Sequence, residues 1–264
     1  MLLLEMLNPR SISYILLLLS LLFSSCQKEN TLQTLFTLMP KSETNIDFNN
    51  KISEGAEVNI VQYLYAYNGG GVAIGDINND ELPDIFFTAN EGPNQLYLNK
   101  GDFKFENISV PAGVTVNNKW SSGVTMADVN GDGWLDIYVC QVSGYQNMEG
   151  QNMLFINNHN NTFTEESENY GLDFQGMATQ ASFFDYDLDN DLDMFLLCHS
   201  NHATDNYRDT SRRHVMDTIS GDRLFRNDGN RFTDVTQNAG IISSKIGYGL
   251  GLVISDLNDD GCPD

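Results

Sequence analysis

A nine-residue acidic segment occurs four times in the chain, and this repeat constrains the fold more than any other feature. The copies are DINNDELPD at 76–84, DVNGDGWLD at 128–136, DYDLDNDLD at 185–193 and DLNDDGCPD at 256–264. Each copy follows a run rich in glycine and apolar residues, and each of the first three precedes a β-prone run such as IFFTA. This recurrence predicts repeated units of strand, acidic loop and strand.

A second pattern follows each of the first three loops and completes the unit. It consists of LYLN, LFIN or LFRN, then a phenylalanine, then a glycine, at 96–113, 154–171 and 224–240. These segments indicate two further strands in each unit. The loops begin at intervals of 52, 57 and 71 residues. Four short strands per repeat at this spacing predict an all-β fold, a β-propeller built from four-stranded antiparallel blades.

The length of the repeat varies mainly between its second and third strands. From the first residue of the loop to the aromatic residue of the third strand, the distance grows from 21 to 27 to 40 residues. Tolerance of insertion is typical of a surface loop. In an antiparallel blade, the connection between strands two and three lies at the opposite end from the turn between strands one and two. We therefore expect the acidic loops and the variable connections on opposite faces.

The acidic loops have the composition of calcium sites. Loop positions 1, 3, 5 and 9 are aspartate or asparagine in all four copies. Side-chain oxygens on alternate residues of a curled loop can converge on one ion, and a backbone carbonyl near position 7 can add another ligand. Such a set of oxygen ligands suits Ca²⁺, whereas zinc and copper prefer histidine and cysteine. The expected ligands are Asp76, Asn78, Asp80, Leu82 and Asp84; Asp128, Asn130, Asp132, Trp134 and Asp136; Asp185, Asp187, Asp189, Asp191 and Asp193; and Asp256, Asn258, Asp260, Cys262 and Asp264, where the position-7 residues contribute their carbonyls.

Position 6 of the loop requires a tight turn. Gly133 and Gly261 provide it, Asn190 tolerates it, and Glu81 does so less readily, which leaves calcium binding by the first loop open. Because the third loop carries an additional acid at position 7, we expect it to bind calcium most tightly, with the Asp191 side chain turned away.

Two other interpretations of the loops are less favoured. A single acidic turn could be merely solvated, but four copies in register make that improbable. An EF-hand requires a glutamate at position 12 between two helices. The chain has Phe87, Val139 and Leu196 there, all within predicted strands.

At residues 60–264 the sequence resembles the calcium-loop β-propellers called FG-GAP or VCBS repeats, which are shared with the integrin α-subunit head. The phrases NGGGVAIGDIN, NQLYLNKGDFKFENISVPAGV and GDRLFRNDGNRFTDVTQNAGI are similar to the cartilage acidic protein branch, which includes bacterial surface lipoproteins. The resemblance implies seven blades, often a downstream ASPIC/UnbV domain, and a role in adhesion or recognition. Because the sequence stops inside its fourth unit, we expect a longer natural protein.

The N-terminus resembles a lipoprotein signal peptide. ISYILLLLSLLFSSC is a short apolar run that ends at a cysteine, and its length is too small to span a bilayer comfortably. We expect a signal peptide at 1–25, lipidation of Cys26, a linker at 26–45 and the partial propeller at 46–264, with repeats at 69–114, 120–172, 177–241 and 246–264. This predicts a bacterial outer-membrane or cell-surface location. An uncleaved anchor and a start at Met6 rather than Met1 stay open.

Charge and composition exclude several classes of function. The chain has 36 acidic against 14 basic residues and a net charge of −22, which opposes binding to nucleic acid or to an anionic membrane surface. Contact with a membrane is expected only through the lipid anchor. Motifs such as GxSxG, HExxH and the P-loop are absent. Cys140 and Cys198 end apolar runs, so both are expected to be buried thiols.

One segment, at 198–217, carries clustered reactive side chains. A metal or catalytic site there, built from Cys198, His199, His202 and His214, is less favoured than a polar surface insertion. Arg212 and Arg213 form an adjacent basic pair that could contact an acidic glycan or carboxylate.

Three functions remain. The first is a non-enzymatic, calcium-stabilised adhesion module at the cell surface that recognises a glycan or protein through the loops opposite the calcium face. The second is a polysaccharide lyase, and the third is a scaffold for further domains.

Overall fold

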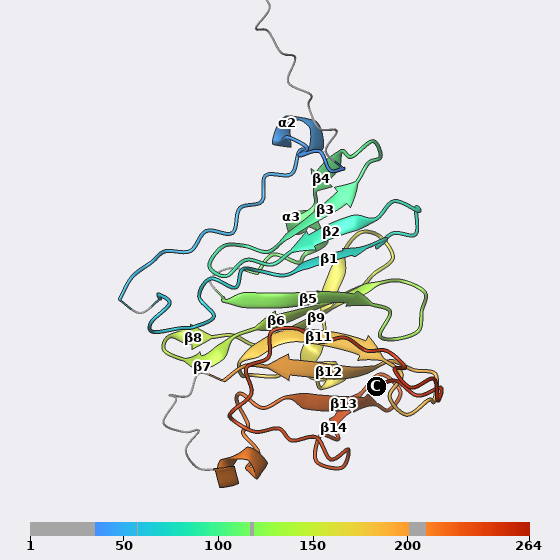
Figure 1. Cartoon of the computed structure of the whole chain (residues 1–264). Helices are drawn as coiled ribbons and strands as arrows, with labels where there is room; N and C mark the ends of the chain where they lie inside the picture. Colours follow the sequence, from blue (N-terminus) through green and yellow to red (C-terminus); the bar gives the residue numbers. More distant parts are fainter. Residues whose placement is uncertain (1–34, 57, 117–118, 201–209) are drawn as a thin grey trace, which may run out of the picture. The chain divides into compact units, whose positions relative to one another are not determined.

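A computed structural model describes residues 35–56, 58–116, 119–200 and 210–264 (Figure 1). The chain divides into two compact units, Met1–Met39 and Pro40–Asp264, and the fold described below is that of the second unit. The predicted signal peptide and Cys26 lie outside the described residues. Among the helices that are described, none has the length and apolar character needed to cross a membrane.

The second unit contains three four-stranded antiparallel sheets, as the repeat predicts. The first has the order β1-β2-β3-β4, the second β10-β9-β6-β5 and the third β11-β12-β13-β14. The strands are β1 (Val72–Gly75), β2 (Asp84–Phe87), β3 (Gln95–Asn99), β4 (Phe105–Asn107), β5 (Ser121–Ala127), β6 (Asp136–Gln141), β9 (Met153–Asn157), β10 (Phe163–Glu165), β11 (Ala178–Phe184), β12 (Asp193–Cys198), β13 (Arg223–Asn227) and β14 (Phe232–Asp234). The all-β class and the four-stranded, propeller-like blades are confirmed.

The remaining elements are short and lie in the connections. The hairpin β7 (Ser143–Tyr145) and β8 (Met148–Glu149) joins β6 to β9, and the 3₁₀ helix η2 (Thr210–His214) lies between β12 and β13. The helices α2 (Lys41–Thr44), α3 (Ser109–Ala112) and α4 (Ser167–Tyr170) have four residues each. The segment 246–264, predicted to begin a fourth blade, contains no assigned strand.

Successive sheets pack face to face through apolar layers. Successive residues of a strand point to opposite sides of the sheet, so the strands of the middle sheet contribute residues to both layers. The layer between the first and second sheets includes Ala73, Phe86, Leu96, Leu98, Val124, Val139 and Phe155. The layer between the second and third sheets includes Tyr138, Cys140, Leu154, Ala181, Met194, Leu196 and Phe225. Each blade is therefore stabilised by its neighbour.

Glycines let the first strands of neighbouring blades approach closely. A Cβ atom on Gly71 would lie 2.8 Å from the Val124 nitrogen, and one on Gly123 would lie 2.4 Å from the Thr179 carbonyl oxygen. Real Cβ atoms do not come this close to backbone atoms. The glycine-rich runs before the acidic loops thus serve blade packing, since only glycine fits where two backbones nearly touch.

An extended N-terminal segment, residues 46–52, covers part of the outer face of the first sheet. Every second residue in it is half-buried, beginning with Ile46 and Phe48. The Phe48 ring stacks on Phe87 with 4.7 Å between centroids, and the Tyr97 hydroxyl donates a hydrogen bond to Asp47 Oδ1 at 2.9 Å. This segment supplies strand-like contacts without being paired into the sheet.

Candidate metal centre

The four acidic loops have the same internal hydrogen bonding. In each loop the carboxylate at position 1 accepts one backbone N–H from position 5 and another from position 6. For the third loop, Asp185 Oδ1 accepts from the Asp189 N–H at 3.1 Å and Oδ2 from the Asn190 N–H at 3.0 Å. The equivalent acceptors are Asp76, Asp128 and Asp256. The sequence repeat therefore encodes one loop conformation four times.

The carboxylate at position 9 is the buried anchor of the loop. Asp84, Asp136 and Asp193 are each 0 % exposed. Asp136 accepts the Val129 N–H at 3.0 Å and the Asn157 N–H at 2.8 Å, so it ties the loop to the third strand of its blade. Asp84 and Asp193 make the same pair of contacts. In the fourth loop Asp264 accepts the Leu257 N–H at 2.8 Å.

Burial disfavours the ionised form of these position-9 carboxyl groups. Loss of hydration raises the pKa of Asp84 and of Asp136 to about 6, and it also raises the pKa of Asp193. The backbone N–H groups that each carboxylate accepts oppose this shift only in part. A cation within the loop would favour the ionised form, because an opposite charge nearby lowers a carboxyl pKa.

The asparagine that ends the third strand also belongs to the acidic end of the blade. The Asn157 amide donates hydrogen bonds to the Leu135 carbonyl in its own loop at 3.0 Å and to the Ile77 carbonyl in the preceding loop at 2.8 Å. Asn227 occupies the same place in the third blade and donates to Leu192 and Val129. In the sequence these asparagines only define the repeat, and their contact with the acidic loops was not predicted. The signal that could have indicated this contact is that an asparagine recurs at the end of the third strand in each unit.

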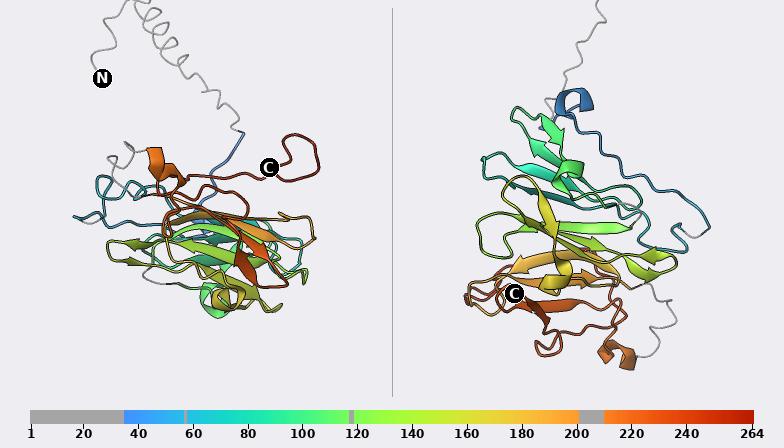
Figure 2. Two further views of the ribbon diagram at one scale, coloured as in Figure 1. Left: turned by 90° about the horizontal axis from the view of Figure 1, so that it is seen from below. Right: turned by 180° about the vertical axis from the view of Figure 1, so that it is seen from behind.

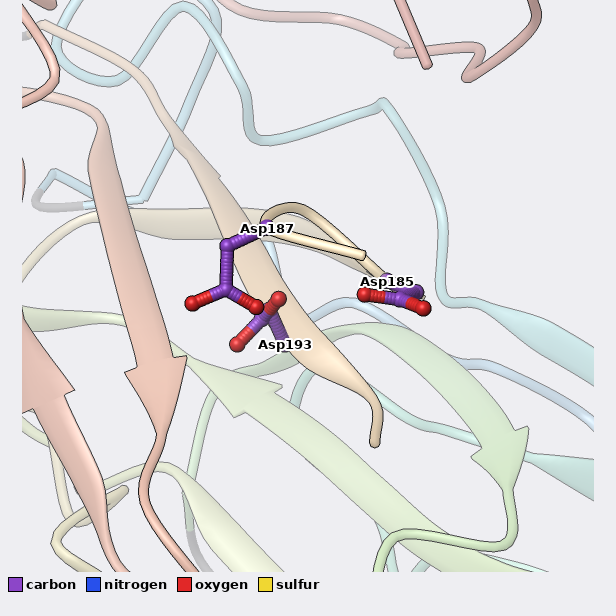
Figure 3. Close-up of side chains that lie close together, drawn as sticks. All are labelled: Asp185, Asp187 and Asp193. Carbon is purple, nitrogen blue, oxygen red and sulfur yellow. The ribbon is translucent and has the colours of Figure 1, made fainter. Parts of the chain in front are cut away.

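The third loop brings three carboxylates together. Asp185, Asp187 and Asp193 each offer an oxygen, and these oxygens lie within 4.8 Å of one another (Figure 3). Within the described ranges no second group of three acidic, histidine or cysteine side chains meets this condition. Asp189, the other expected side-chain ligand, is outside the group; its Oδ1 accepts the Asp191 N–H at 3.1 Å.

Asp191 is the additional acid of the third loop, at position 7. One of its carboxylate oxygens is buried and has no hydrogen-bond partner among the described residues. Burial, followed by repulsion from Asp189, Asp193 and Asp187, raises the pKa of this carboxyl to about 6. The expectation that Asp191 ligates through its carbonyl, with its side chain turned away, stays a prediction. The repulsion from the three other carboxylates shows that the Asp191 side chain adds to the negative charge of the loop.

The other loops differ from the third at position 3. Asparagine there contributes one oxygen and no charge, and the Asn130 and Asn258 Oδ1 atoms each accept the position-5 N–H at 3.0 Å. In the first loop Asn78 donates to Asp80 Oδ2 at 3.0 Å.

The position-7 residues Leu82, Trp134 and Cys262 donate their N–H groups to the position-5 carboxylates, each at 2.9 Å.

Left-handed backbone conformations close the loop at two positions. Position 6 has a positive φ in every copy, including 68° at Glu81 and 75° at Asn190. Position 4 also has a positive φ in every copy, including 63° at Leu188. The first loop thus adopts the shared conformation in spite of Glu81. The requirement at position 4 was not predicted, because leucine disfavours this region.

Replacing Glu81 by glycine is expected to stabilise the protein by roughly 0.5–1 kcal/mol, because a left-handed conformation costs a non-glycine residue about 1–2 kcal/mol and glycine loses part of this gain as chain entropy. Urea unfolding measures the change. The matched control is Glu168→Gly, which places glycine in helix α4 and should destabilise by about 1 kcal/mol. A destabilised Glu81→Gly variant would contradict the assignment of strain.

The sulfur and histidine candidates do not form a metal site in the described part of the chain. Cys140 and Cys198 are buried thiols, as predicted, and burial raises the pKa of both. His199 is buried between Tyr63 and Thr179. His214 is exposed, and His202 lies outside the described residues.

The opposite ends of the blades carry the variable connections and several cavities, three of which share lining residues. The β7–β8 hairpin and the acidic loops lie at opposite ends of the sheets in both views (Figures 1 and 2), which confirms the predicted separation of the two kinds of loop. These three cavities measure about 270, 700 and 390 Å³. Their linings include Trp120 in the first and third, and Lys119 and Glu149 in the second and third.

Comparison with known proteins supports the repeat assignment. The model of the FG-GAP-like repeat matches residues 76–139. Cartilage acidic protein 1 of Xenopus tropicalis is 31 % identical over 215 residues, which is 76 % of this chain and 29 % of that protein. The human protein of the same name is 29 % identical over 204 residues, 75 % of this chain and 28 % of its own length. The chain thus spans less than a third of the length of these curated relatives.

Proposed function

We propose that the chain is a calcium-stabilised recognition module of the adhesion type, because residues 76–139 match the FG-GAP-like repeat and the chain is similar to cartilage acidic protein 1. One end of the blades binds calcium through the acidic loops. The other end recognises a glycan or a protein. The module acts at a cell surface, to which a lipid on Cys26 attaches it.

The observation that supports this proposal most is the difference between the two ends of the blades: one end is uniform and the other is variable. At one end, four loops repeat the same hydrogen bonds within a few tenths of an ångström. At the other end, the connections differ in length and cavities open between them. A uniform end suits a structural role, and a variable end suits recognition of a partner.

The donor set of the acidic loops fits calcium. It consists of carboxylate and amide oxygens, the ligands that a hard cation prefers. Asp185, Asp187 and Asp193 supply the convergent group, and the unpartnered oxygen of Asp191 adds negative charge beside it. In the other loops the residues at positions 1, 3, 5 and 9 would hold the ion. Calcium bound there would stabilise the loop conformation.

A binding role is favoured over an enzymatic one by how the acidic residues are used. The position-1 and position-9 carboxylates accept backbone N–H groups that hold the loop together. A general acid must instead release and regain a proton freely at the substrate. These loop carboxylates therefore suit a structural role better than a catalytic one.

A binding experiment on the two ends tests the proposed function. The protein, with calcium, is applied to arrays of glycans and of extracellular proteins, and binding is compared among variants. Lys119→Glu and Glu149→Lys, which reverse charges beside two cavities of the variable end, should weaken binding at least tenfold with little change in melting temperature. Asp187→Asn in the third acidic loop should lower the melting temperature but preserve binding well below it.

The reverse pattern would contradict the proposal. If Asp187→Asn abolished binding while the protein was folded, and the Lys119 and Glu149 variants bound normally, the ligand would be recognised at the acidic end. Conversion of an array glycan into unsaturated products would show a lyase.

A further inference from the structure

The 270 Å³ cavity at the variable end is formed where the first strands of the blades begin. Gly71, Ser122 and Thr179 line it, and they stand at or next to the starts of β1, β5 and β11. Residues 250–252 and the segment before β1 close the remaining sides. The cavity therefore draws its walls from all three sheets, whereas the other two cavities share Lys119 and Glu149 in their linings.

The lining of this cavity is uncharged, although the chain has a net charge of −22. None of the described residues that line it is aspartate, glutamate, lysine or arginine. His199 is part of the lining, and burial lowers its pKa to about 4, so it is neutral near pH 7. A charged ligand would lose its hydration there and find no opposite charge, and this cost selects for a neutral ligand.

Aromatic rings form a rigid side of the cavity. The Tyr65 ring stacks on His199 with 3.8 Å between centroids, and Tyr63 packs edge-on against Trp120 at 5.5 Å. The His199 Nε2 lies 2.9 Å from the Tyr63 hydroxyl, and Nδ1 lies 3.0 Å from the Thr179 hydroxyl. Since both nitrogens of the imidazole have a partner, its ring orientation is fixed. These contacts pre-organise the wall before a ligand arrives.

Three polar groups in the lining remain available to a ligand. The Asn68 side-chain amide, the Tyr65 hydroxyl and the Trp120 indole N–H make no hydrogen bonds to other described residues. All three groups are accessible to solvent. Trp120 and Tyr65 are nonetheless 6 % and 8 % exposed as whole residues. Polar groups that reach solvent without a protein partner bond to water, and a ligand that enters the cavity can replace this water.

From these observations we infer that the cavity binds a single neutral sugar unit of the glycan that the module recognises. A sugar presents apolar C–H faces that pack on aromatic rings and hydroxyls that bind amide and hydroxyl groups. The volume lies at the lower limit of small-molecule pockets, which suits one monosaccharide unit. The inference rests on the proposed recognition function and specifies its ligand and place.

Isothermal titration calorimetry of the full chain, with calcium present, tests the inference. The probes are the methyl glycosides of glucose, galactose, mannose and N-acetylglucosamine, with glucuronate and glucosamine as charged counterparts. At least one neutral glycoside should bind, and the charged sugars should bind at least tenfold more weakly. Tyr65→Phe and Asn68→Ala should each weaken binding about threefold to tenfold, the effect of one lost hydrogen bond.

Tyr67→Phe is the matched control for Tyr65→Phe. Tyr67 lies two residues away, outside the cavity, and its hydroxyl donates to Glu54 at 2.8 Å. This variant should bind the neutral glycoside normally, and all three variants should melt within about 2 °C of the unchanged protein. Tyr65→Phe keeps the ring that stacks on His199, so it separates loss of the hydroxyl from loss of the fold.

Absence of binding by every neutral glycoside would overturn the inference, as would binding that Tyr65→Phe and Asn68→Ala leave unchanged. If array binding depended on Lys119 and Glu149 but not on Tyr65 and Asn68, the proposed function would stand and the cavity assignment would fail. If no glycan or protein bound at all, both would fail.

Discussion

Removal of calcium is expected to lower the melting temperature of this protein by roughly 5–10 °C for each loop that binds the ion tightly. An ion that binds only the folded state, at about 100 times its Kd, contributes about 2.7 kcal/mol. For a domain of this size, 1 kcal/mol shifts the melting temperature by about 2–4 °C. Thermal unfolding in calcium and in chelator measures the difference. Superimposable curves would exclude calcium as a stabilising ion.

The third loop should account for a large part of this effect, because it alone carries the convergent group of Asp185, Asp187 and Asp193 among the described residues. Asp187→Asn removes one of these charges and should reduce the difference between the two melting curves. The matched control is Asp102→Asn, which makes the same chemical change in a turn outside the four loops and should leave the difference unchanged. Equal effects of the two variants would show that net charge, not the loop, governs stability.

Replacement of Asn157 by alanine is expected to destabilise the protein by roughly 2–5 kcal/mol. The side chain is buried, donates to the carbonyls of Ile77 and Leu135, and accepts the His159 N–H at 2.9 Å. Each buried polar group left without a partner costs about 1–3 kcal/mol. Urea unfolding, with calcium present, measures the loss of stability.

Asn158→Ala is the matched control for this experiment. Asn158 is the next residue and is exposed, and among the described residues its side chain bonds only to Thr162 and Thr164. Its replacement should change stability by no more than about 0.5 kcal/mol. If Asn157→Ala were as mild as Asn158→Ala, the contacts between neighbouring loops would not hold the blades together.

Features that repeat along the chain could be predicted from the sequence. The order of strands in each sheet and the turn at loop position 6 follow from residues that recur in register, because a repeated local signal specifies a repeated local structure. The separation of the two kinds of loop follows from antiparallel pairing. The left-handed conformation at Leu188 could not be predicted from the sequence, because the loop closure overrides the conformational preference of leucine.

The uncharged cavity could not be predicted, because its residues are far apart in the sequence and belong to no motif. Tyr63 and His199 are separated by 136 residues and meet only when the blades pack. The sequence instead suggested His199 as a possible member of a metal cluster or a surface insertion. In the structure the residue is 1 % exposed and holds two hydroxyl groups.

The contact between Asn157 and the preceding loop has a consequence for how calcium would be taken up. The asparagine belongs to the second blade, but the Ile77 carbonyl that it holds lies in the first acidic loop. An ion that orders one loop would therefore reduce the conformational freedom of the next, so a second ion would pay a smaller entropy cost. Uptake by neighbouring loops would be positively cooperative, and the acidic end of the blades would fill over a narrower range of calcium concentration than independent sites do.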